Sequence, residues 1–172
     1  MQQDLWNDYN LTYFRNCHDG NCHLVENLWI GGWSRGADPS GFHVIDLTGG
    51  RPGVYEIGGT FAETVSLISP LSWLSLPIRD FDVPPYDLEV WLSLAREIRQ
   101  VGEPVLVVCD GGHGRSGTVA AILAFLLAPD VVGDDPVQWI RSHYCRLAVE
   151  TQGQDEYVMK MSHDATTCPL PD

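Results

Sequence analysis

The sequence predicts an α/β fold in which helices cover both faces of a sheet, and three observations support this. Short apolar runs typical of strands alternate along the chain with longer segments of helical periodicity. The motif Cys-Asp-Gly-Gly-His-Gly-Arg-Ser at 109–116 lies between a β-branched run and an apolar helix, which places a candidate site at the carboxyl end of a strand. The length of 172 residues suits a single domain with a full core.

Five segments are expected to form the strands of this sheet. Each is short and largely apolar, and glycine, proline or polar residues lie at or near its ends. The run Pro-Val-Leu-Val-Val before the motif has the composition of a strand that is buried on both faces. The expected strands span residues 24–30, 43–47, 54–57, 73–78 and 104–108.

Four further segments are expected to be helices, spanning residues 86–101, 116–128, 135–145 and 151–162. The first has apolar residues at helical spacing and is therefore amphipathic, whereas the second is almost wholly apolar and is expected to be buried. The third begins at Asp135 and Pro136, because proline suits the first helical turn. In the fourth, Thr151 is the expected N-cap and Gln154 its capping-box partner.

The loop at 109–116 has the chemistry of a phosphate site. Gly111, Gly112 and Gly114 let the backbone curl so that successive N–H groups point inward, and the following helix adds the positive end of its dipole. Arg115 supplies a planar, two-pronged donor that matches two oxygens of a phosphoryl group. We therefore expect this loop to hold an oxyanion.

The same loop offers a nucleophile. The positive field that binds a phosphoryl group also favours the thiolate form of Cys109. Ser116 is expected to hydrogen-bond the sulfur and to ease its departure in a second step. Asp110 belongs to the binding loop and is expected to turn its side chain toward the scaffold. For His113 two interpretations stay open, contact with a second anionic group of the substrate or local hydrogen bonds in the loop.

A phosphoester leaving group needs a proton, and the segment around Asp80 is the candidate source. It follows a predicted strand and ends in two prolines, so the carboxyl group lies on a short, stiff loop. A well-placed acid contributes ~10²–10⁴ in rate. Asp82 is the competing donor. Phe81 lies between the two, either as a core side chain or at the entrance, where it would stack on an aromatic ring.

These segments resemble a known family. Residues 108–118 look like the signature of the cysteine-based protein tyrosine and dual-specificity phosphatases, in particular the branch that includes the kinase-associated phosphatase of cyclin-dependent kinases. Residues 80–84 are similar to the acid loop of the compact members, with Arg79 in place of the usual proline. Residues 148–158 are similar to the segment that opens their last helix. Val108 departs from the pattern, because the family usually has a histidine there that tunes the thiol and orders the loop.

The resemblance spans about residues 24–160 and implies the compact dual-specificity phosphatase fold, with a central mixed, mostly parallel sheet of four or five strands. It implies that the protein hydrolyses phosphotyrosine in proteins, with phosphoserine and phosphothreonine as further substrates, and requires no metal or cofactor. The reaction would pass through a phosphocysteine intermediate on Cys109, with Arg115 holding the phosphoryl oxygens and Asp80 as the acid.

The resemblance also bears on the downstream segment. Gln154 either completes the capping box or lies near the site and helps to place the hydrolytic water. Glu150 and Thr151 are expected to fix the segment against the core.

The charge balance narrows the range of partners. A formal net charge of −13 with only ten Lys and Arg argues against nucleic-acid binding and against anionic membranes. A substrate with one phosphate on an uncharged or basic scaffold fits best. No apolar stretch reaches the ~18–20 residues of a membrane helix, and no basic region precedes an apolar core at the N-terminus. We therefore expect a cytoplasmic protein. We also expect it to be a monomer.

Outside the motifs the sequence leaves several questions open. Residues 1–16 are a possible N-terminal arm, and residues 165–172 a loose tail. Five cysteines, an odd number, disfavour a complete disulfide framework. Cys17 and Cys22 are free, disulfide-bonded or metal-bound. Cys145 is either a packed helix cysteine or a partner of Cys109 in a reversible disulfide.

Two other functions compete with protein phosphatase activity. One is hydrolysis of a non-protein phosphoester, such as a nucleotide, an RNA 5′ end or an inositol phosphate. The charge balance argues against the polyanionic members of that group. The other is a phosphate-binding module without turnover, against which the presence of the thiol, the arginine and the acid together argues.

Overall fold

A computed structural model describes residues 19–49 and 71–167. Its centre is a five-stranded sheet with the strand order β1-β2-β5-β3-β4. Only β1 runs antiparallel to its neighbour, and the other pairs are parallel. The predicted α/β fold with a mixed, mostly parallel sheet is therefore confirmed. The strands are β1 (Cys22–Val25), β2 (Leu28–Gly32), β3 (His43–Asp46), β4 (Ser72–Ser75) and β5 (Val105–Cys109).

Two of the expected strands differ from those observed, and a third lies outside the described residues. The single strand expected at 24–30 is a hairpin of β1 and β2, because the chain turns at Glu26, which has a φ of 46°. Asn27 secures this turn by donating to the carbonyl groups of Ile98 and Glu103. The regular part of β4 stops before Pro77, which has no amide hydrogen to donate. The strand expected at 54–57 falls in the part of the chain that is not described.

Helices form at the four expected places, namely α3 (Leu88–Val101), α4 (Gly114–Leu127), α6 (Pro136–His143) and α7 (Gln152–Thr166). Two short helices were not predicted, η1 (Trp33–Arg35) and α5 (Pro129–Val132). The helix α7 runs past residue 162 and buries Ala165, so the expected tail does not begin at residue 165. Within the described ranges no helix is long and apolar enough to cross a bilayer.

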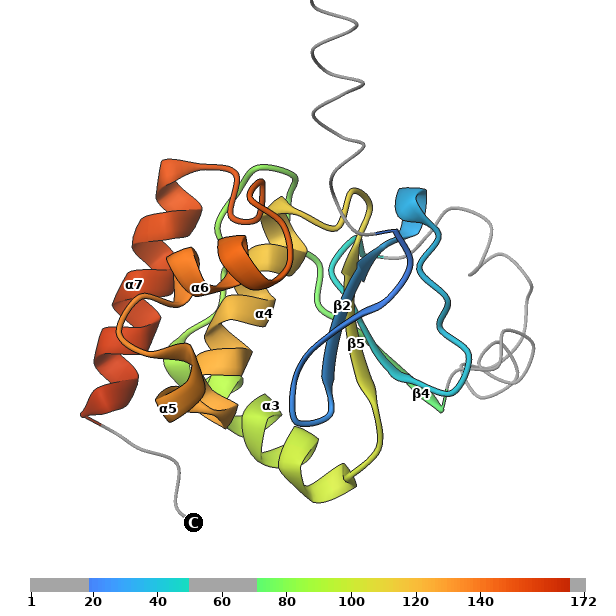
Figure 1. The fold of residues 1–172 in the computed structure, drawn as a ribbon, viewed down its shortest axis with the longest axis horizontal. Helices are drawn as coiled ribbons and strands as arrows, with labels where there is room; N and C mark the ends of the chain where they lie inside the picture. Colours follow the sequence, from blue (N-terminus) through green and yellow to red (C-terminus); the bar gives the residue numbers. More distant parts are fainter. Residues whose placement is uncertain (1–18, 50–70, 168–172) are drawn as a thin grey trace, which may run out of the picture.

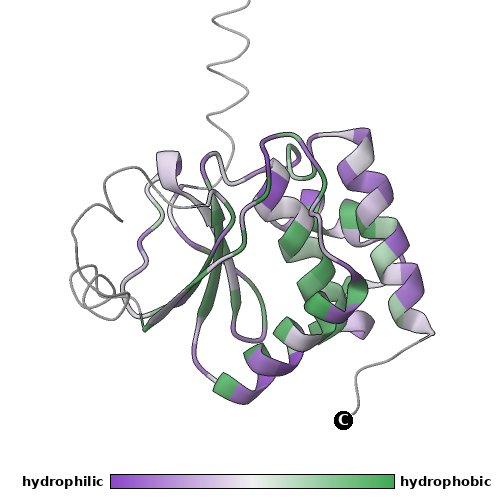
Figure 2. Ribbon diagram, turned by 180° about the vertical axis from the view of Figure 1, so that it is seen from behind, coloured by the Kyte–Doolittle hydropathy of each residue, from purple (hydrophilic) through white to green (hydrophobic). Residues whose placement is uncertain are grey.

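The helix α4 is the centre of the core. It packs against β1, β2 and β5 on one side and against α3, α6 and α7 on the other, and twelve of its fourteen residues are buried. Figure 1 shows α3 to α7 gathered on one side of the sheet, and in Figure 2 the hydrophobic colour is strongest in α4 and the central strands. The site at the start of α4 therefore rests on a rigid element.

An aromatic cluster covers the opposite face of the sheet, where the described residues place only the short helix η1. The rings of Trp33 and Trp73 stack with centroids 5.5 Å apart, over the buried side chains of Val44, Leu106 and Val108. The alternation of side chains along β5 explains this division, because Val105, Val107 and Cys109 face the helices.

Candidate active site

The motif loop connects β5 to α4 and rests on the end of β2. Cys109 is the last residue of β5, where it pairs with Gly32, and α4 begins at Gly114. A Cβ atom at Gly32 would lie 2.6 Å from the amide nitrogen of Gly112, so only glycine fits at this contact. Gly112 itself has a φ of 76°, a conformation that glycine adopts without strain. The glycines at the end of β2 therefore form the floor of the loop.

The Cys109 thiol is buried at the base of this loop. Its exposed fraction is 2%, and the Gly112 amide donates to its sulfur at 3.2 Å. The fully buried Ser116 hydroxyl donates to the Gly31 carbonyl at 3.3 Å, whereas the sequence predicted a bond to the sulfur. The Gly31 carbonyl is the available acceptor because β2 ends directly beside the start of α4.

Arg115 connects the loop to the segment that carries the candidate acid. Its guanidinium donates to the Ile78 carbonyl at 3.3 Å and forms an ion pair with Asp80 at 3.1 Å. The Arg115 side chain is only 11% exposed, and its buried Nε atom has no hydrogen-bond partner among the described residues. These contacts hold the guanidinium in place and leave some of its N–H groups without an acceptor. Such N–H groups can donate to the oxygens of a tetrahedral oxyanion.

Asp80 and Asp82 occupy different environments. The Asp80 carboxylate lines the cavity above Cys109, whereas Asp82 accepts a hydrogen bond from the next amide, that of Val83, at 2.9 Å. Phe81, with a φ of 60°, is 62% exposed and lines the same cavity. It is therefore a residue of the entrance and not of the core.

The cavity has a volume of about 190 Å³. Its walls bring together three segments that are far apart in the sequence, namely the acid loop, the motif loop and the segment that precedes α7. The lining residues are Asp80, Phe81, Cys109, Asp110, Gly111, His113, Gly114, Arg115 and Glu150.

Glu150 lines the cavity, whereas the sequence predicted only that it fixes its segment against the core. The Gly114 amide donates to its carboxylate, and burial, followed by the nearby charge of Asp80, raises the pKa of Glu150. The backbone places it there by a turn at Val149, whose φ is 62°. Arg141 of α6 stabilises this turn by donating to the carbonyl groups of Ala148 and Val149 at 3.0 and 2.8 Å.

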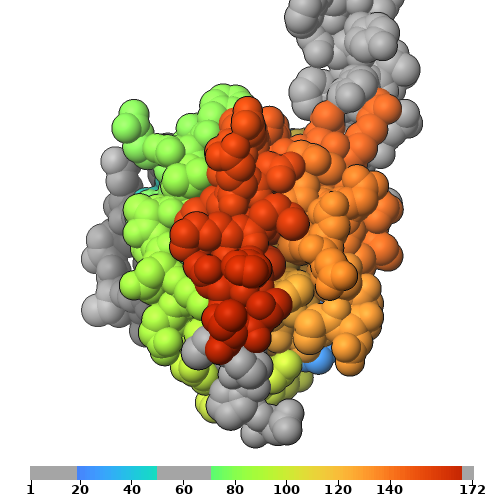
Figure 3. Space-filling model, turned by 90° about the vertical axis from the view of Figure 1, so that its left-hand side faces the viewer, coloured from blue at the N-terminus to red at the C-terminus, as the bar shows by residue number. Residues whose placement is uncertain are grey.

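Gln154 is fully buried between Glu150 and the acid loop. Its side-chain oxygen accepts from the amides of Glu150 and Thr151, and its Nε2 donates to the Asp82 carbonyl at 3.1 Å. Thr151 and Gln154 also form the predicted capping box. In Figure 3, α7 lies on the surface between the chain segment of α3 and that of α6. Gln154 therefore joins the start of α7 to the loop of Asp80.

The remaining loop side chains point in different directions. The Asp110 side chain is exposed and lines the cavity, whereas the sequence predicted that it faces the scaffold. His113 is buried, and burial together with the charge of Arg35 lowers its pKa to about 4. It is neutral at pH 7 and carries no charge with which to attract a second anion. Burial also raises the pKa of Tyr144, a residue of the shell that surrounds Cys109.

Of the cysteines outside the loop, the structure describes Cys22 and Cys145. Cys22 is a free cysteine in β1, and Cys17 lies outside the described residues. Cys145 is disulfide-bonded and Cys109 is free, so these two are not joined. In residues 19–49 and 71–167 no group of three His, Cys, Asp or Glu side chains is arranged to hold a metal ion.

Comparison with known proteins identifies the family. The model of the DSP-PTPase phosphatase domain of the Swiss Army Knife proteins matches residues 59–158. An uncharacterized protein of Methanocaldococcus jannaschii is 33% identical over 121 residues, which are 69% of this chain and 80% of the relative. The chain therefore belongs to the DSP-PTPase phosphatase family, which confirms the resemblance seen in its motifs.

Solved structures share the fold at low sequence identity. A mutant form of Tk-PTP superposes with a TM-score of 0.62 at 21% identity, covering 86% of this chain and 97% of that one. PTPMT1 in complex with PI(5)P gives 0.61 at 14% identity, with the same coverage. Kinase-associated phosphatase gives 0.54 at 20% identity, covering 73% and 71%. These three structures show that the chain has the fold of known phosphatases, in agreement with its family.

Proposed function

We propose that this protein is a cysteine-dependent phosphomonoesterase that hydrolyses phosphotyrosine in proteins, with phosphoserine and phosphothreonine as further substrates. We also propose that it acts as a single-domain monomer in the cytoplasm. The observation that carries the proposal is the composition of one cavity. It holds a buried thiol, a nearly buried guanidinium and a carboxyl group from a separate loop.

In the first step the Cys109 thiolate attacks phosphorus in line with the ester oxygen. The sulfur–phosphorus bond forms as the phosphorus–oxygen bond breaks, and Asp80 gives its proton to the departing oxygen. Arg115 and the loop amides hold the three equatorial oxygens, where charge stabilisation contributes most. The products of this step are the free alcohol or phenol and a phosphocysteine.

In the second step water attacks the phosphocysteine. Asp80, now a carboxylate, accepts a proton from the water, and the thiolate of Cys109 leaves as inorganic phosphate forms. Gln154 supports this step from behind the site, because its Nε2 holds the backbone of the acid loop. A direct contact between Gln154 and the water would use the second N–H of Nε2, because the first is bonded to the Asp82 carbonyl.

The surroundings of the cavity support a phosphoprotein substrate. The exposed ring of Phe81 at the entrance can stack on a phosphotyrosine ring. Apart from Arg115, no Lys or Arg lines the described cavity, which favours one phosphate over several. The second candidate is a phosphoinositide, since the similar fold of PTPMT1 was solved in complex with PI(5)P.

Kinetics on a panel of substrates tests the proposal. The panel contains a phosphotyrosine peptide, a phosphothreonine peptide, PI(5)P and p-nitrophenyl phosphate, all under reducing conditions. We expect the highest kcat/KM on the phosphotyrosine peptide and none with Cys109→Ser, which should still bind phosphate. A higher kcat/KM on PI(5)P would overturn the protein-substrate assignment, and turnover by Cys109→Ser would overturn the mechanism.

A further inference from the structure

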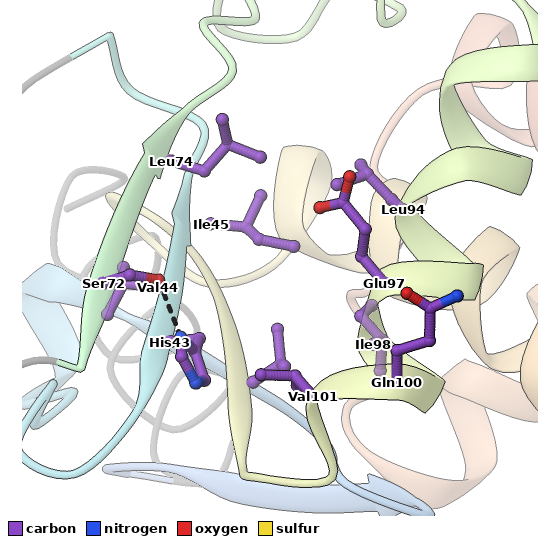
Figure 4. Close-up of a pocket in the computed structure, with 11 residues that line it drawn as sticks. His43, Val44, Ile45, Ser72, Leu74, Leu94, Glu97, Ile98, Gln100 and Val101 are labelled. Carbon is purple, nitrogen blue, oxygen red and sulfur yellow. Dashed lines mark hydrogen bonds between the residues drawn. The ribbon is translucent and has the colours of Figure 1, made fainter.

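An open groove runs along the side of the molecule between β4 and α3, outside the active-site cavity. It consists of two hollows of about 420 and 410 Å³ that share Leu74, Leu94 and Glu97. Figure 4 shows Leu74 and Ile45 projecting from the sheet toward Leu94 and Glu97 of α3, with the hollow between them. The groove continues along the chain segment that leads from β4 to the acid loop.

The floor of this groove is apolar and partly uncovered. Two of the six large apolar side chains that the structure leaves exposed line it, namely Leu74 and Val101, with exposed fractions of 40% and 38%. Ile98 and Leu94 continue the same surface. Clustered exposed apolar side chains mark interaction sites far more often than scattered ones do.

The rim of the groove is negatively charged. Its lining residues include Asp87, Glu89 and Glu97 and no Lys or Arg. Asp87 caps α3 and Glu89 pairs with Arg96. Glu97 lines both hollows and has no partner among the described residues. One unpaired carboxylate therefore stands beside apolar surface at the middle of the groove.

The strand β4 borders the groove as an edge strand. It pairs with β3 on one side and is the last strand of the described sheet. An extended segment that pairs with such an edge directs alternate side chains to the same face of the sheet. For β4 one of these faces is the groove, since Leu74 projects into it (Figure 4).

We propose that the groove between β4 and α3 binds an extended segment of a partner protein that pairs with the edge of β4. On the face of the segment that is turned to the groove, apolar and cationic side chains alternate. The apolar side chains pack on the floor, and a cationic side chain pairs with Glu97. The charge of the rim selects this occupant, because an acidic or a purely apolar segment leaves Glu97 unpaired. The proposal concerns binding alone and is independent of the reaction in the cavity.

A designed peptide tests this binding. The probe is fluorescein-labelled Thr-Leu-Thr-Arg-Thr-Leu-Thr, which presents leucine, arginine and leucine on one face of a strand, and its control carries glutamate in place of arginine. Affinities come from fluorescence anisotropy, and amide shifts locate the contact. We expect binding of the probe but not of the control, with shifts in β4 and the facing part of α3.

Matched variants distinguish binding at the groove from non-specific attraction of a cationic peptide to an acidic protein. Glu97→Gln should weaken binding up to about fivefold, as one exposed ion pair predicts. Leu74→Ser should weaken it by roughly tenfold, with an unchanged melting temperature showing that the variant folds. Glu156→Gln, which removes the same charge from the exposed face of α7, should have no effect.

Three results would overturn the proposal. The first is an equal loss of affinity in Glu97→Gln and Glu156→Gln, which would show that the peptide responds to the net charge of the protein and not to Glu97. The second is unchanged affinity for a probe N-methylated at alternate amides in both registers, since pairing with β4 needs those N–H groups. The third is a wild-type dimer in sedimentation that Leu74→Ser dissociates, which would make the occupant a second copy of this chain.

Discussion

Two carboxyl groups line the candidate active site, and the charges around them differ. Asp80 lies 3.1 Å from the Arg115 guanidinium and is largely exposed. Glu150 accepts a hydrogen bond from the Gly114 amide, and partial burial, followed by the charge of Asp80, raises its pKa. A pair of carboxyl groups with different environments can divide the work of donating and accepting protons. Their separate contributions are therefore measurable by substitution.

Replacing Asp80 tests its role as the acid. Asp80→Asn should lower kcat on an alkyl phosphoester by ~10²-fold or more, because a poor leaving group needs the proton. The effect should be far smaller on p-nitrophenyl phosphate, whose leaving group is stable as an anion. Asp82→Asn is the matched control and should retain nearly full activity. If the two variants behave the other way round, the acid has been misassigned.

Glu150 should supply a proton where Asp80 is absent. Burial, the larger of the two causes that raise the pKa of Glu150, remains when the charge of Asp80 is removed. Glu150 therefore holds its proton to a higher pH than an ordinary glutamate and loses this capacity as the pH rises further. The residual kcat of Asp80→Asn should therefore fall with increasing pH, approaching tenfold per pH unit. The double variant Asp80→Asn/Glu150→Gln should lose both this activity and its slope. An unchanged residual rate would assign Glu150 a structural role only.

His113 should make the stability of the fold depend on pH. Its pKa falls from 6.5 to about 4 in the folded protein, so between these values the unfolded chain binds a proton that the native chain does not. The free energy of unfolding should therefore decrease as the pH falls through this range, by up to about 3 kcal/mol. Urea titrations of wild type, His113→Gln and the exposed control His163→Gln measure this. The slope should be reduced only in His113→Gln.

At the scale of elements, the active site depends on the close approach of β2 to the motif loop. Gly32→Ala places a methyl group against the backbone of Gly111 and Gly112, and such overpacking typically costs about 1–3 kcal/mol. We expect lower stability in urea and a loss of kcat, because the loop must move. Gly153→Ala, where a Cβ meets only ordinary contacts, should leave kcat unchanged. Equal behaviour of the two variants would argue against the glycine floor.

The sequence was most informative where chemistry and local pattern coincide. Cys109, Arg115 and the strand–loop–helix around them follow from composition and spacing, as does the buried helix α4. Glu150 could not be found in this way, because its position depends on the left-handed turn at Val149 and on Arg141, a residue of another helix. The hairpin of β1 and β2 was missed for a similar reason, since Glu26 turns the chain without a glycine.

For the whole molecule, a net charge of −13 should shape substrate choice through long-range repulsion. Raising NaCl from ~10 to ~300 mM shortens the Debye length several-fold. The kcat/KM for a phosphopeptide with acidic flanks should then rise, and that for a peptide with basic flanks should fall. A neutral peptide serves as the control. Parallel responses of all three peptides would show that the field of the protein does not select substrates.

The ion pair between Arg115 and Asp80 links the release of Asp80 to the arrival of substrate. In the proposed mechanism Asp80 and a phosphoryl group compete for one guanidinium, so an arriving substrate would displace the aspartate and free it to face the leaving group. Away from the guanidinium the carboxylate would take up a proton more readily, and it could then donate this proton to the leaving group. Free sulfate has no ester to cleave and would displace Asp80 from Arg115 without a reaction. The inhibition constant of sulfate should therefore report how strongly Asp80 competes with an oxyanion for the guanidinium.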